Sequence, residues 1–212
     1  AIAVAIIGRK VDDADPASRP AANLRDGATV VASLVTFGLV LNILQLVQGG
    51  ARPSLELLEV FHGVHLAFEV EPLGMLFALV AAGLWIPTSI YAFGYMRGHH
   101  EINQTRFFVC FAVAIFAALG IAFARNLFTL FLFYELLTFS TYPLVTHAGT
   151  EKAKRAGRVY LGVLVFTSVA FFLCAILLTA HYTGGDLEFT PGGILEGKVE
   201  GTPVFVLLAL FS

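Results

Sequence analysis

The sequence has few charged residues for a protein of its length. Only 13% of its 212 residues are Asp, Glu, Lys or Arg, whereas soluble domains contain about 25%. Hydrophobic residues make up 58% of the chain, and the mean hydropathy is +0.82. This composition excludes a soluble domain with an ordinary charged surface, because most of its surface could not face water.

Cysteines and catalytic motifs are also scarce. The two cysteines, Cys110 and Cys174, lie inside apolar runs, where a free cysteine behaves as a small hydrophobic residue. The sequence therefore excludes a disulfide framework and a Cys-x-x-Cys metal site. It holds no glycine-rich phosphate loop, Ser/His/Asp arrangement or haem ligation pattern, and the spacing in His99-His100-Glu101 is not distinctive of a metal site. We expect no cofactor, no metal and no catalytic site of the soluble kind.

Long apolar runs dominate instead. A run of about 18 or more apolar residues can cross the ~30 Å hydrocarbon core as a helix, and continuous runs favour helices over the alternating strands of a membrane barrel. We therefore expect an all-α integral membrane bundle with about five full spans and two partial ones. The runs predict spans near 28–48, 72–96, 107–124, 126–147 and 158–183, with a helix end at 1–8 and a partial span from 203.

Both ends of the chain look like truncations. The sequence begins without Met, and its first apolar stretch, residues 1–8, is followed at once by two basic residues. That stretch is a poor match to a secretory signal peptide. The last apolar stretch, residues 202–212, is too short to span. We expect residues 1–212 to be a single membrane-domain fragment of a larger subunit.

The connections between the predicted spans differ in charge. Short cytoplasmic loops of membrane proteins carry an excess of Lys and Arg. The connections at 9–27, 97–106 and 148–158 hold ten of the thirteen basic residues, and the opposite connections hold three. We expect the first set to be cytoplasmic. The basic stretch at 151–158 is either a contact to lipid headgroups or only a topology signal, and the pattern favours the second.

Two outer connections carry further patterns. Polar and apolar residues nearly alternate over residues 65–71, and Gly63 could supply a turn before them. This pattern predicts a short β-hairpin within the connection at 49–71. The connection at 184–201 is rich in glycine and contains Pro191, so we expect it to form an irregular loop that lies on the bundle.

One acidic residue lies near the middle of an apolar helix. Of the fifteen acidic residues, fourteen lie in predicted loops or at span ends, and Glu135 is the exception. An ionisable side chain at bilayer mid-depth costs about 2.5–3.5 kcal/mol on insertion scales, so it should face the bundle interior or water. The default hypothesis is an ion or proton pathway. The alternative is a residue that packs or assembles helices and never titrates.

Hydroxyl groups follow Glu135 along the same helix. Positions three, four and seven residues apart share a helical face, which aligns Glu135 with Thr138 and Tyr142. Such hydroxyls can hydrogen-bond a carboxylate, hold a water chain or only join helices. His147 ends the same predicted helix, where an imidazole could pass protons onward or only meet the basic loop. We expect Glu135 to act in proton transfer or as an ion-pair switch, with Thr138, Tyr142 and His147 as candidate relay groups.

These residues resemble the fifth helix of a known family. Residues 125–128 (Arg-Asn-Leu-Phe), 134–136 (Tyr-Glu-Leu) and 140–144 (Ser-Thr-Tyr-Pro-Leu) are similar to that helix in the proton-translocating antiporter-like subunits. Those subunits occur in respiratory complex I, Mrp-type cation/proton antiporters and membrane-bound hydrogenases. Residues 71–77 and 91–96 resemble the family's third helix, which often begins with Asp-Pro-Leu where this chain has Glu-Pro-Leu. The resemblance extends from the end of the first helix to the start of the seventh.

The resemblance implies a larger fold with two inverted repeats, of which this chain would contain half. It also implies that Glu135 pairs with a lysine on a broken seventh helix and modulates the proton affinity of that lysine, which would lie beyond residue 212. Tyr134 before Glu135, together with residues 146–158, looks most similar to the D-type subunit of Mrp antiporters. Complex I, a hydrogenase-type arm and a membrane partner in inorganic-carbon uptake are the alternative branches.

The resemblance further implies a function and partners. We expect an ion- or proton-translocating subunit of a multisubunit cation (sodium)/proton antiporter in the bacterial cell (inner) membrane. Its partners would be other membrane subunits of a hetero-oligomeric complex, the lipid bilayer, protons and a monovalent cation, and not nucleic acid. A transporter subunit would not itself be an enzyme, although in complex I or a hydrogenase it would belong to a redox-driven translocase. The remaining alternative is a structural membrane subunit that does not transport.

Overall fold

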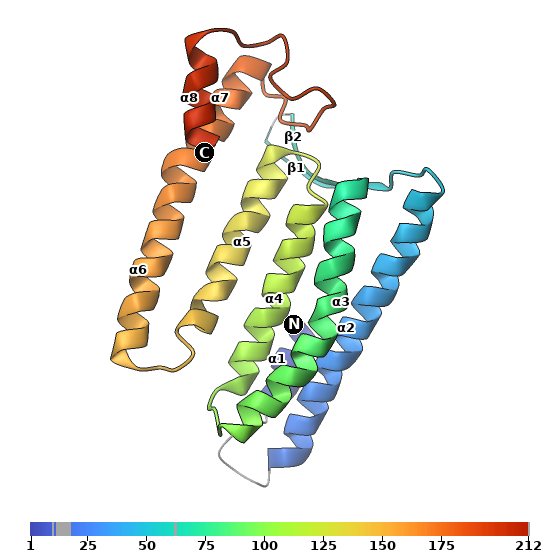
Figure 1. Cartoon of the computed structure of the whole chain (residues 1–212), viewed down its shortest axis with the longest axis vertical. Coiled ribbons are helices and arrows are strands. Elements are labelled where there is room, and N and C mark those ends of the chain that lie inside the picture. The colour runs from blue at the N-terminus through green and yellow to red at the C-terminus, as the bar shows by residue number, and fades with distance from the viewer. Residues whose placement is uncertain (10, 12–17, 62, 212) are drawn as a thin grey trace.

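The computed structural model describes residues 1–9, 11, 18–61 and 63–211; Lys10 and His62 lie outside these ranges. Its long helices lie side by side (Figure 1). Five helical segments among the described residues are long and apolar enough to cross a membrane, which confirms the predicted all-α membrane bundle. The elements are α1 (Ile2–Gly8), α2 (Arg19–Gln48), β1 (Ser54–Phe61), β2 (Val64–Glu69), α3 (Pro72–Gly98), α4 (Gln104–Ala122), α5 (Leu127–Val145), α6 (Glu151–Thr167), the π-helix η2 (Ser168–Leu173), α7 (Cys174–Thr183) and α8 (Thr202–Phe211).

Two spanning helices begin earlier than the apolar runs predict. α2 begins nine residues, and α6 seven residues, before the predicted starts, so the predicted loops at 9–27 and 148–158 are partly helical. Pro20 lies in the first turn of α2, where proline fits a helix. The Thr150 side chain caps α6 by accepting a hydrogen bond from the backbone N–H of Ala153 at 3.1 Å. These first turns are charged yet helical, because proline and the cap, rather than hydrophobicity, set where each helix starts.

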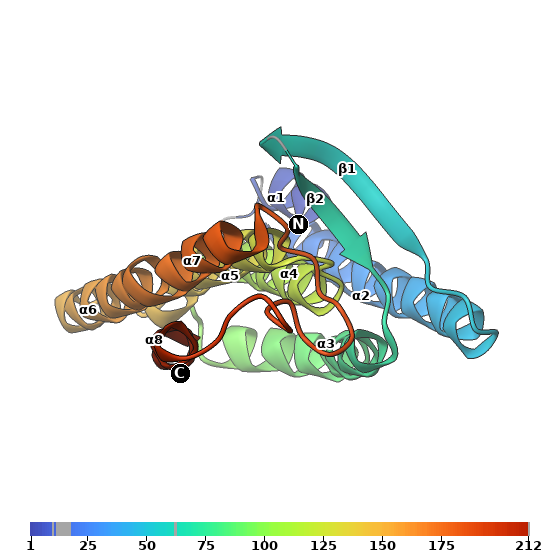
Figure 2. The same ribbon diagram turned by 90° about the horizontal axis from the view of Figure 1, so that it is seen from above.

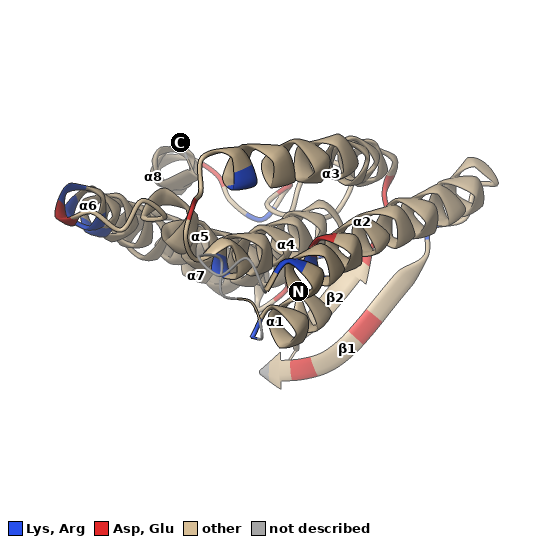
Figure 3. Cartoon of the chain, turned by 90° about the horizontal axis from the view of Figure 1, so that it is seen from below, with Lys and Arg blue, Asp and Glu red and all other residues tan. Residues whose placement is uncertain are grey.

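The two ends of the bundle differ in charge. We call the end formed by the start of α2 and by the α3–α4 and α5–α6 connections the basic end, where Lys and Arg gather (Figure 3). The opposite end, formed by the strands and residues 184–201, is the hairpin end. Its basic residues Arg52, Arg125 and Lys198 each form an ion pair with an acidic residue. Which end faces the cytoplasm stays a prediction.

The predicted β-hairpin is confirmed and is fixed to the start of α5. β1 and β2 pair antiparallel, and Gly63 between them has φ +82°, a conformation that favours glycine. The backbone N–H of Ala67 in β2 donates to Oγ1 of Thr129 at 3.1 Å. Nδ2 of Asn126 donates to the carbonyl of His65 at 2.8 Å. These two bonds join the hairpin to the first turn of α5.

The connection at 184–201 lies on the bundle, as its composition predicted. The backbone N–H of Leu127 donates to the carbonyl of Leu187 at 3.0 Å, and Leu187 is buried together with Leu127 and Ile176. The chain then enters α8, which lies on the opposite side of the α4–α5–α7 row from the hairpin (Figure 2). The start of α5 is therefore held from two directions.

Candidate functional site

Glu135 lies at the middle of α5. The helix has 19 residues, and Asn126 caps it by accepting a hydrogen bond from the N–H of Thr129 at 2.7 Å. The Glu135 side chain is half-buried. Its Oε1 atom is buried and has no hydrogen-bond partner among the described residues. Because an unpaired polar atom in apolar surroundings is unfavourable, this oxygen is suited to accept a proton, a cation or a hydrogen-bond donor.

The two residues before Glu135 show which way α5 is turned. A β-carbon on Gly120 of α4 would collide with the ring of Phe133, so Phe133 packs against α4. The ring of Tyr134 lies 5.9 Å from that of Phe172 in η2. Successive helical positions are about 100° apart, so Glu135 is turned about 200° from the face that packs on α4. Glu135 thus lies away from the close contact between α4 and α5.

Residues on the Glu135 face approach α6 nearer the basic end. A β-carbon on Gly157 of α6 would lie 3.2 Å from Cε2 of Tyr142 and would collide with Thr146. Helical spacing puts Glu135, Tyr142 and Thr146 on one stripe, as the sequence predicted. Gly157 therefore allows α6 to come close to this stripe.

The hydroxyl groups near Glu135 bond to their own helix. Oγ1 of Thr138 donates to the carbonyl of Tyr134 at 3.0 Å, and Oγ1 of Thr146 donates to the carbonyl of Tyr142 at 3.0 Å. Among the described residues no hydrogen bond joins Glu135 to Thr138 or Tyr142. Because each hydroxyl proton is used in this way, these threonines do not donate to the carboxylate. Their oxygen atoms can still accept a hydrogen bond. The relay roles of Thr138 and Tyr142 stay predictions.

His147 belongs to a different neighbourhood. Its Nε2 lies 3.7 Å from Oε2 of Glu101 in the α3–α4 connection, and its ring lies 5.5 Å from that of Phe107. It follows Glu135 by twelve residues, which corresponds to about 18 Å along a helix. A proton passing between the two would need intermediate groups, so His147 as a relay stays a prediction.

A second group of charged residues, which sequence reasoning missed, lies at the basic end, and two of its three members are buried. Nε of Arg25 lies 2.8 Å from Oδ1 of Asp26, and Nη2 of Arg97 lies 2.5 Å from Oδ2 of Asp26. Arg25 also donates to Oγ1 of Thr105 and Oε1 of Gln104, each at 3.1 Å. Arg25 and Asp26 are 0% and 6% exposed. We call Arg25, Asp26 and Arg97 the buried ion cluster; it joins α2, α3 and α4.

The sequence does carry a signal for this cluster. Pro20 marks a first helical turn, which puts Arg25 and Asp26 in the second turn of α2 rather than in the predicted loop at 9–27. Asp26 thus lies inside the first turns of a spanning helix and not in a loop, whereas Glu135 lies at the middle of one. Asp26 forms ion pairs with two arginines, whereas no described residue forms an ion pair with Glu135.

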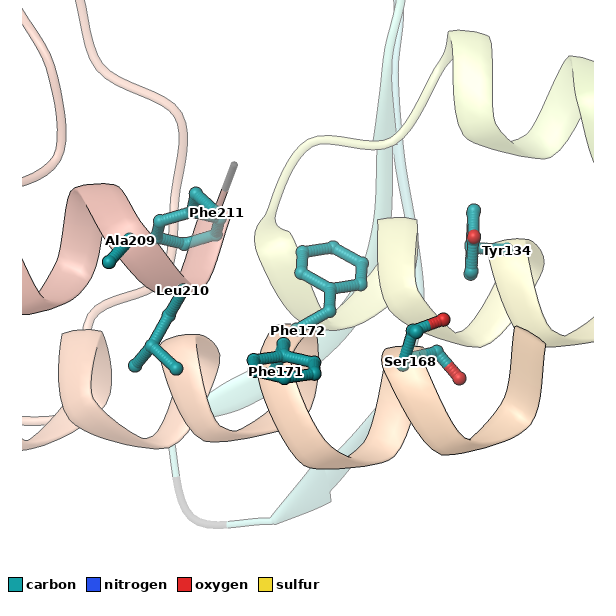
Figure 4. A pocket seen from close by; sticks show the side chains of 8 residues that line it. Tyr134, Ser168, Phe171, Phe172, Ala209, Leu210 and Phe211 are labelled. Carbon is teal, nitrogen blue, oxygen red and sulfur yellow. The ribbon is translucent and has the colours of Figure 1, made fainter. Parts of the chain in front are cut away.

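A pocket opens beside Tyr134, one residue before Glu135. It has a volume of about 510 Å³ and lies between α5, η2 and α8; Figure 4 shows the lining side chains. One wall is the π-helix, a rare widened turn that is frequent at functional sites. The other wall is the end of α8, including Leu210 and Phe211. The structure therefore brings the end of α8, the last described helix, to the side of α5 on which Tyr134 lies.

Two family models match the chain. The model described as "NADH-Ubiquinone oxidoreductase (complex I), chain 5 N-terminus" matches residues 61–108. The model described as "NADH:quinone oxidoreductase/Mrp antiporter, TM" matches residues 124–211. They match in chain order and together cover well over half of the sequence. The third-helix and fifth-helix segments that carried the resemblance lie inside these matches.

Curated relatives agree with the family models. Na(+)/H(+) antiporter subunit A1 of Staphylococcus aureus (strain bovine RF122 / ET3-1) is 26% identical over 146 residues, which is 68% of this chain and 18% of that protein. The chain thus spans less than a fifth of the length of that relative. The relative is an A-type subunit, whereas the sequence pattern favours the D-type; the D-type assignment stays a prediction.

Two solved structures share the fold. A chain of the membrane-bound sulfane sulfur reductase, an archaeal respiratory membrane complex, aligns with a TM-score of 0.69 and 20% identity, over 99% of this chain and 40% of that one. A chain of the Mrp complex from Dietzia sp. DQ12-45-1b aligns with a TM-score of 0.70 and 16% identity, over 99% and 21%. These structures show a shared fold, and the two family models, which match residues 61–108 and 124–211, show that the chain belongs to the family of antiporter-like membrane subunits that NADH:quinone oxidoreductase and Mrp antiporters share.

Proposed function

We propose that this chain is part of the ion-translocating subunit of a multisubunit cation (sodium)/proton antiporter, with Glu135 as the intramembrane group that exchanges a proton or an ion-pair partner. The observation that carries the proposal is the carboxylate at the middle of α5, whose buried Oε1 has no hydrogen-bond partner among the described residues. An intramembrane ionisable residue is a functional-site hypothesis by default. The family membership and the named antiporter relative support the same interpretation.

The partner that the resemblance implies for Glu135 is a lysine on the family's seventh helix, of which α8 would be the start. In support, the end of α8 lines the same pocket as Tyr134, the residue next to Glu135. Two unit charges about 4 Å apart at an effective dielectric near 20 attract by about 4 kcal/mol. That energy changes the proton affinity of the partner about a thousandfold. A carboxylate that approaches or leaves the lysine would therefore switch it between charged and neutral states.

The test is Glu135→Gln in the complete complex. Glutamine keeps the shape and polarity of the side chain but cannot ionise, so we expect cation/proton exchange in reconstituted vesicles to be lost while the subunits still assemble. The matched control is Glu200→Gln, which removes an exposed carboxylate at the hairpin end and should exchange at the wild-type rate. Normal exchange by the Glu135→Gln complex would contradict the proposal and support a structural role.

The second candidate is a proton-pumping arm of a redox complex. The match to a complex I family model and the fold shared with an archaeal respiratory complex favour it. It uses Glu135 in the same way but derives energy from electron transfer. Identification of the proteins that copurify with the full-length subunit separates the two, because flavin or iron–sulfur subunits are expected only in the redox complex.

A further inference from the structure

The first turns of α6 carry basic side chains that differ in their partners. Nζ of Lys154 lies 2.9 Å from Oε1 of Glu151, so this lysine is neutralised within its own turn. Lys152, Arg155 and Arg158 are exposed and form no ion pair with any residue that the structure describes. The start of α6 therefore keeps an excess of positive charge after its internal pairing.

Helical geometry divides these side chains between faces. Gly157 packs against α5, which fixes the inner face of α6. At about 100° per residue, Lys152 and Arg155 lie on the opposite, outer face, whereas Lys154 lies close to the inner one. Figure 3 shows the charged start of α6 at the edge of the bundle. Two unpaired cations thus point away from the rest of the chain.

An apolar stripe continues the same outer face along α6. Val159, Val163 and Phe166 follow Lys152 and Arg155 at helical spacing and are 63%, 58% and 65% exposed. The face therefore has cations at the basic end and a hydrocarbon-like surface below them. This order of groups matches a phospholipid, whose anionic headgroup lies above its acyl chains.

We propose that the outer face of α6 binds an anionic phospholipid, with Lys152 and Arg155 contacting the headgroup phosphate and Val159, Val163 and Phe166 contacting an acyl chain. Charge complementarity selects an anionic lipid, because clusters of Lys and Arg beside a spanning helix attract acidic headgroups. The apolar stripe selects a lipid over a soluble anion. The pairing of Lys154 with Glu151 assigns the site to one face rather than to the whole basic stretch, for which the sequence alone favours a topology signal.

The experiment uses the complete complex in phosphatidylcholine vesicles that contain a trace of photoactivatable phosphatidylglycerol. After illumination, mass spectrometry locates the label within residues 151–166, and unlabelled competitor lipid is titrated. We expect label on this segment that phosphatidylglycerol displaces and phosphatidylcholine does not. Arg155→Ala should weaken this binding about fivefold, as expected for one charge at a membrane surface. Its matched control, Lys154→Ala, removes an adjacent but paired cation and should leave labelling unchanged.

Three results would overturn the proposal. Displacement of the label by phosphatidylcholine as effective as that by phosphatidylglycerol would show that the site does not select for the headgroup charge. Equal losses from Arg155→Ala and Lys154→Ala would show that the whole basic stretch acts without a preferred face. A photo-crosslinker at position 155 that labels a neighbouring subunit in place of lipid would show that the face is a protein interface. None of these outcomes depends on ion exchange, so they leave the role of Glu135 unaffected.

Discussion

The buried ion cluster and Glu135 both bring ionisable groups into spanning helices, but with different surroundings. In the cluster, Asp26 lies between two arginines, and Arg25 also bonds to Thr105 and Gln104. At Glu135, Oε1 has no such partner among the described residues. A charge that is fully paired holds helices together, whereas one that lacks a partner can change its proton or its neighbour. We therefore expect a structural role for the cluster, whereas the transporting role of Glu135 is our proposal.

The largest expected effect on stability is that of Asp26→Asn. It leaves Arg25, which is 0% exposed, without its carboxylate, and breaking a buried pair from one side costs about 3–5 kcal/mol. We expect a lower unfolding temperature and less assembled complex, measured by thermal scanning of the purified complex. The matched control is Asp186→Asn, because Asp186 pairs with Lys198 in an exposed contact of 3.6 Å. Its cost should stay at about 0.2–1 kcal/mol. Similar losses from both would refute a structural role for the cluster.

Gly157→Ala should have the next largest effect. The added methyl group would collide with Thr146 and push α6 away from the Glu135 face of α5, at a cost of about 1–3 kcal/mol. Gly162→Ala on the same helix is the control, since nothing lies within 4 Å of its β-carbon. That change should be neutral or stabilising, because alanine favours helix. Thermal scanning measures both. If Gly157→Ala were as mild as Gly162→Ala, α5 and α6 would not be in close contact.

Arg97→Ala tests the exposed side of the cluster. The Arg97 side chain is 46% exposed, so solvent screens its attraction to Asp26, which keeps Arg25 as a partner. We expect a loss of about 0.2–1 kcal/mol in unfolding free energy, measured by thermal scanning of the same complex. A loss as large as that of Asp26→Asn would show that Asp26 needs both arginines.

Glu135→Gln should have the smallest effect on stability of the four. It removes a charge that no described residue pairs with, and the proposed lysine partner can give up its proton instead of remaining charged and unpaired, so the unfolding temperature of the complex should change little. The same variant is expected to lose exchange activity. Glu135→Gln should therefore affect transport and spare stability, whereas Asp26→Asn should lower stability. Thermal scanning beside the vesicle assay checks both. A clear fall in unfolding temperature would assign Glu135 to helix packing instead.

Sequence patterns predicted the features that depend on local order. Alternation and Gly63 indicated the hairpin, apolar runs indicated the spans, and helical spacing placed Glu135 and Tyr142 on one face. The apolar pattern missed the burial of Arg25 and Asp26, because a span defined by hydrophobicity begins only after its last charged residue. Pro20 indicated the true start of α2 more closely than the loss of hydrophobicity did.

Sequence patterns could not predict contacts between distant segments. Nothing local indicates that His147 lies beside Glu101, since that pairing depends on how α3, α4 and α5 assemble. The π-helix at 168–173 has no evident sequence signal either, because its residues would fit an ordinary α-helix equally well. These two features therefore needed the structure.

The attachment of the hairpin to α5 has a consequence for how the protein is made. β2 supplies the acceptor for the Asn126 side chain and the donor for Thr129, so the first turn of α5 is completed by a segment from two helices earlier. The ribosome releases β2 well before α5. We therefore expect the folded hairpin to act as a template that positions α5 when that helix inserts. Errors in folding this short hairpin would then misplace Glu135 without altering any residue near it.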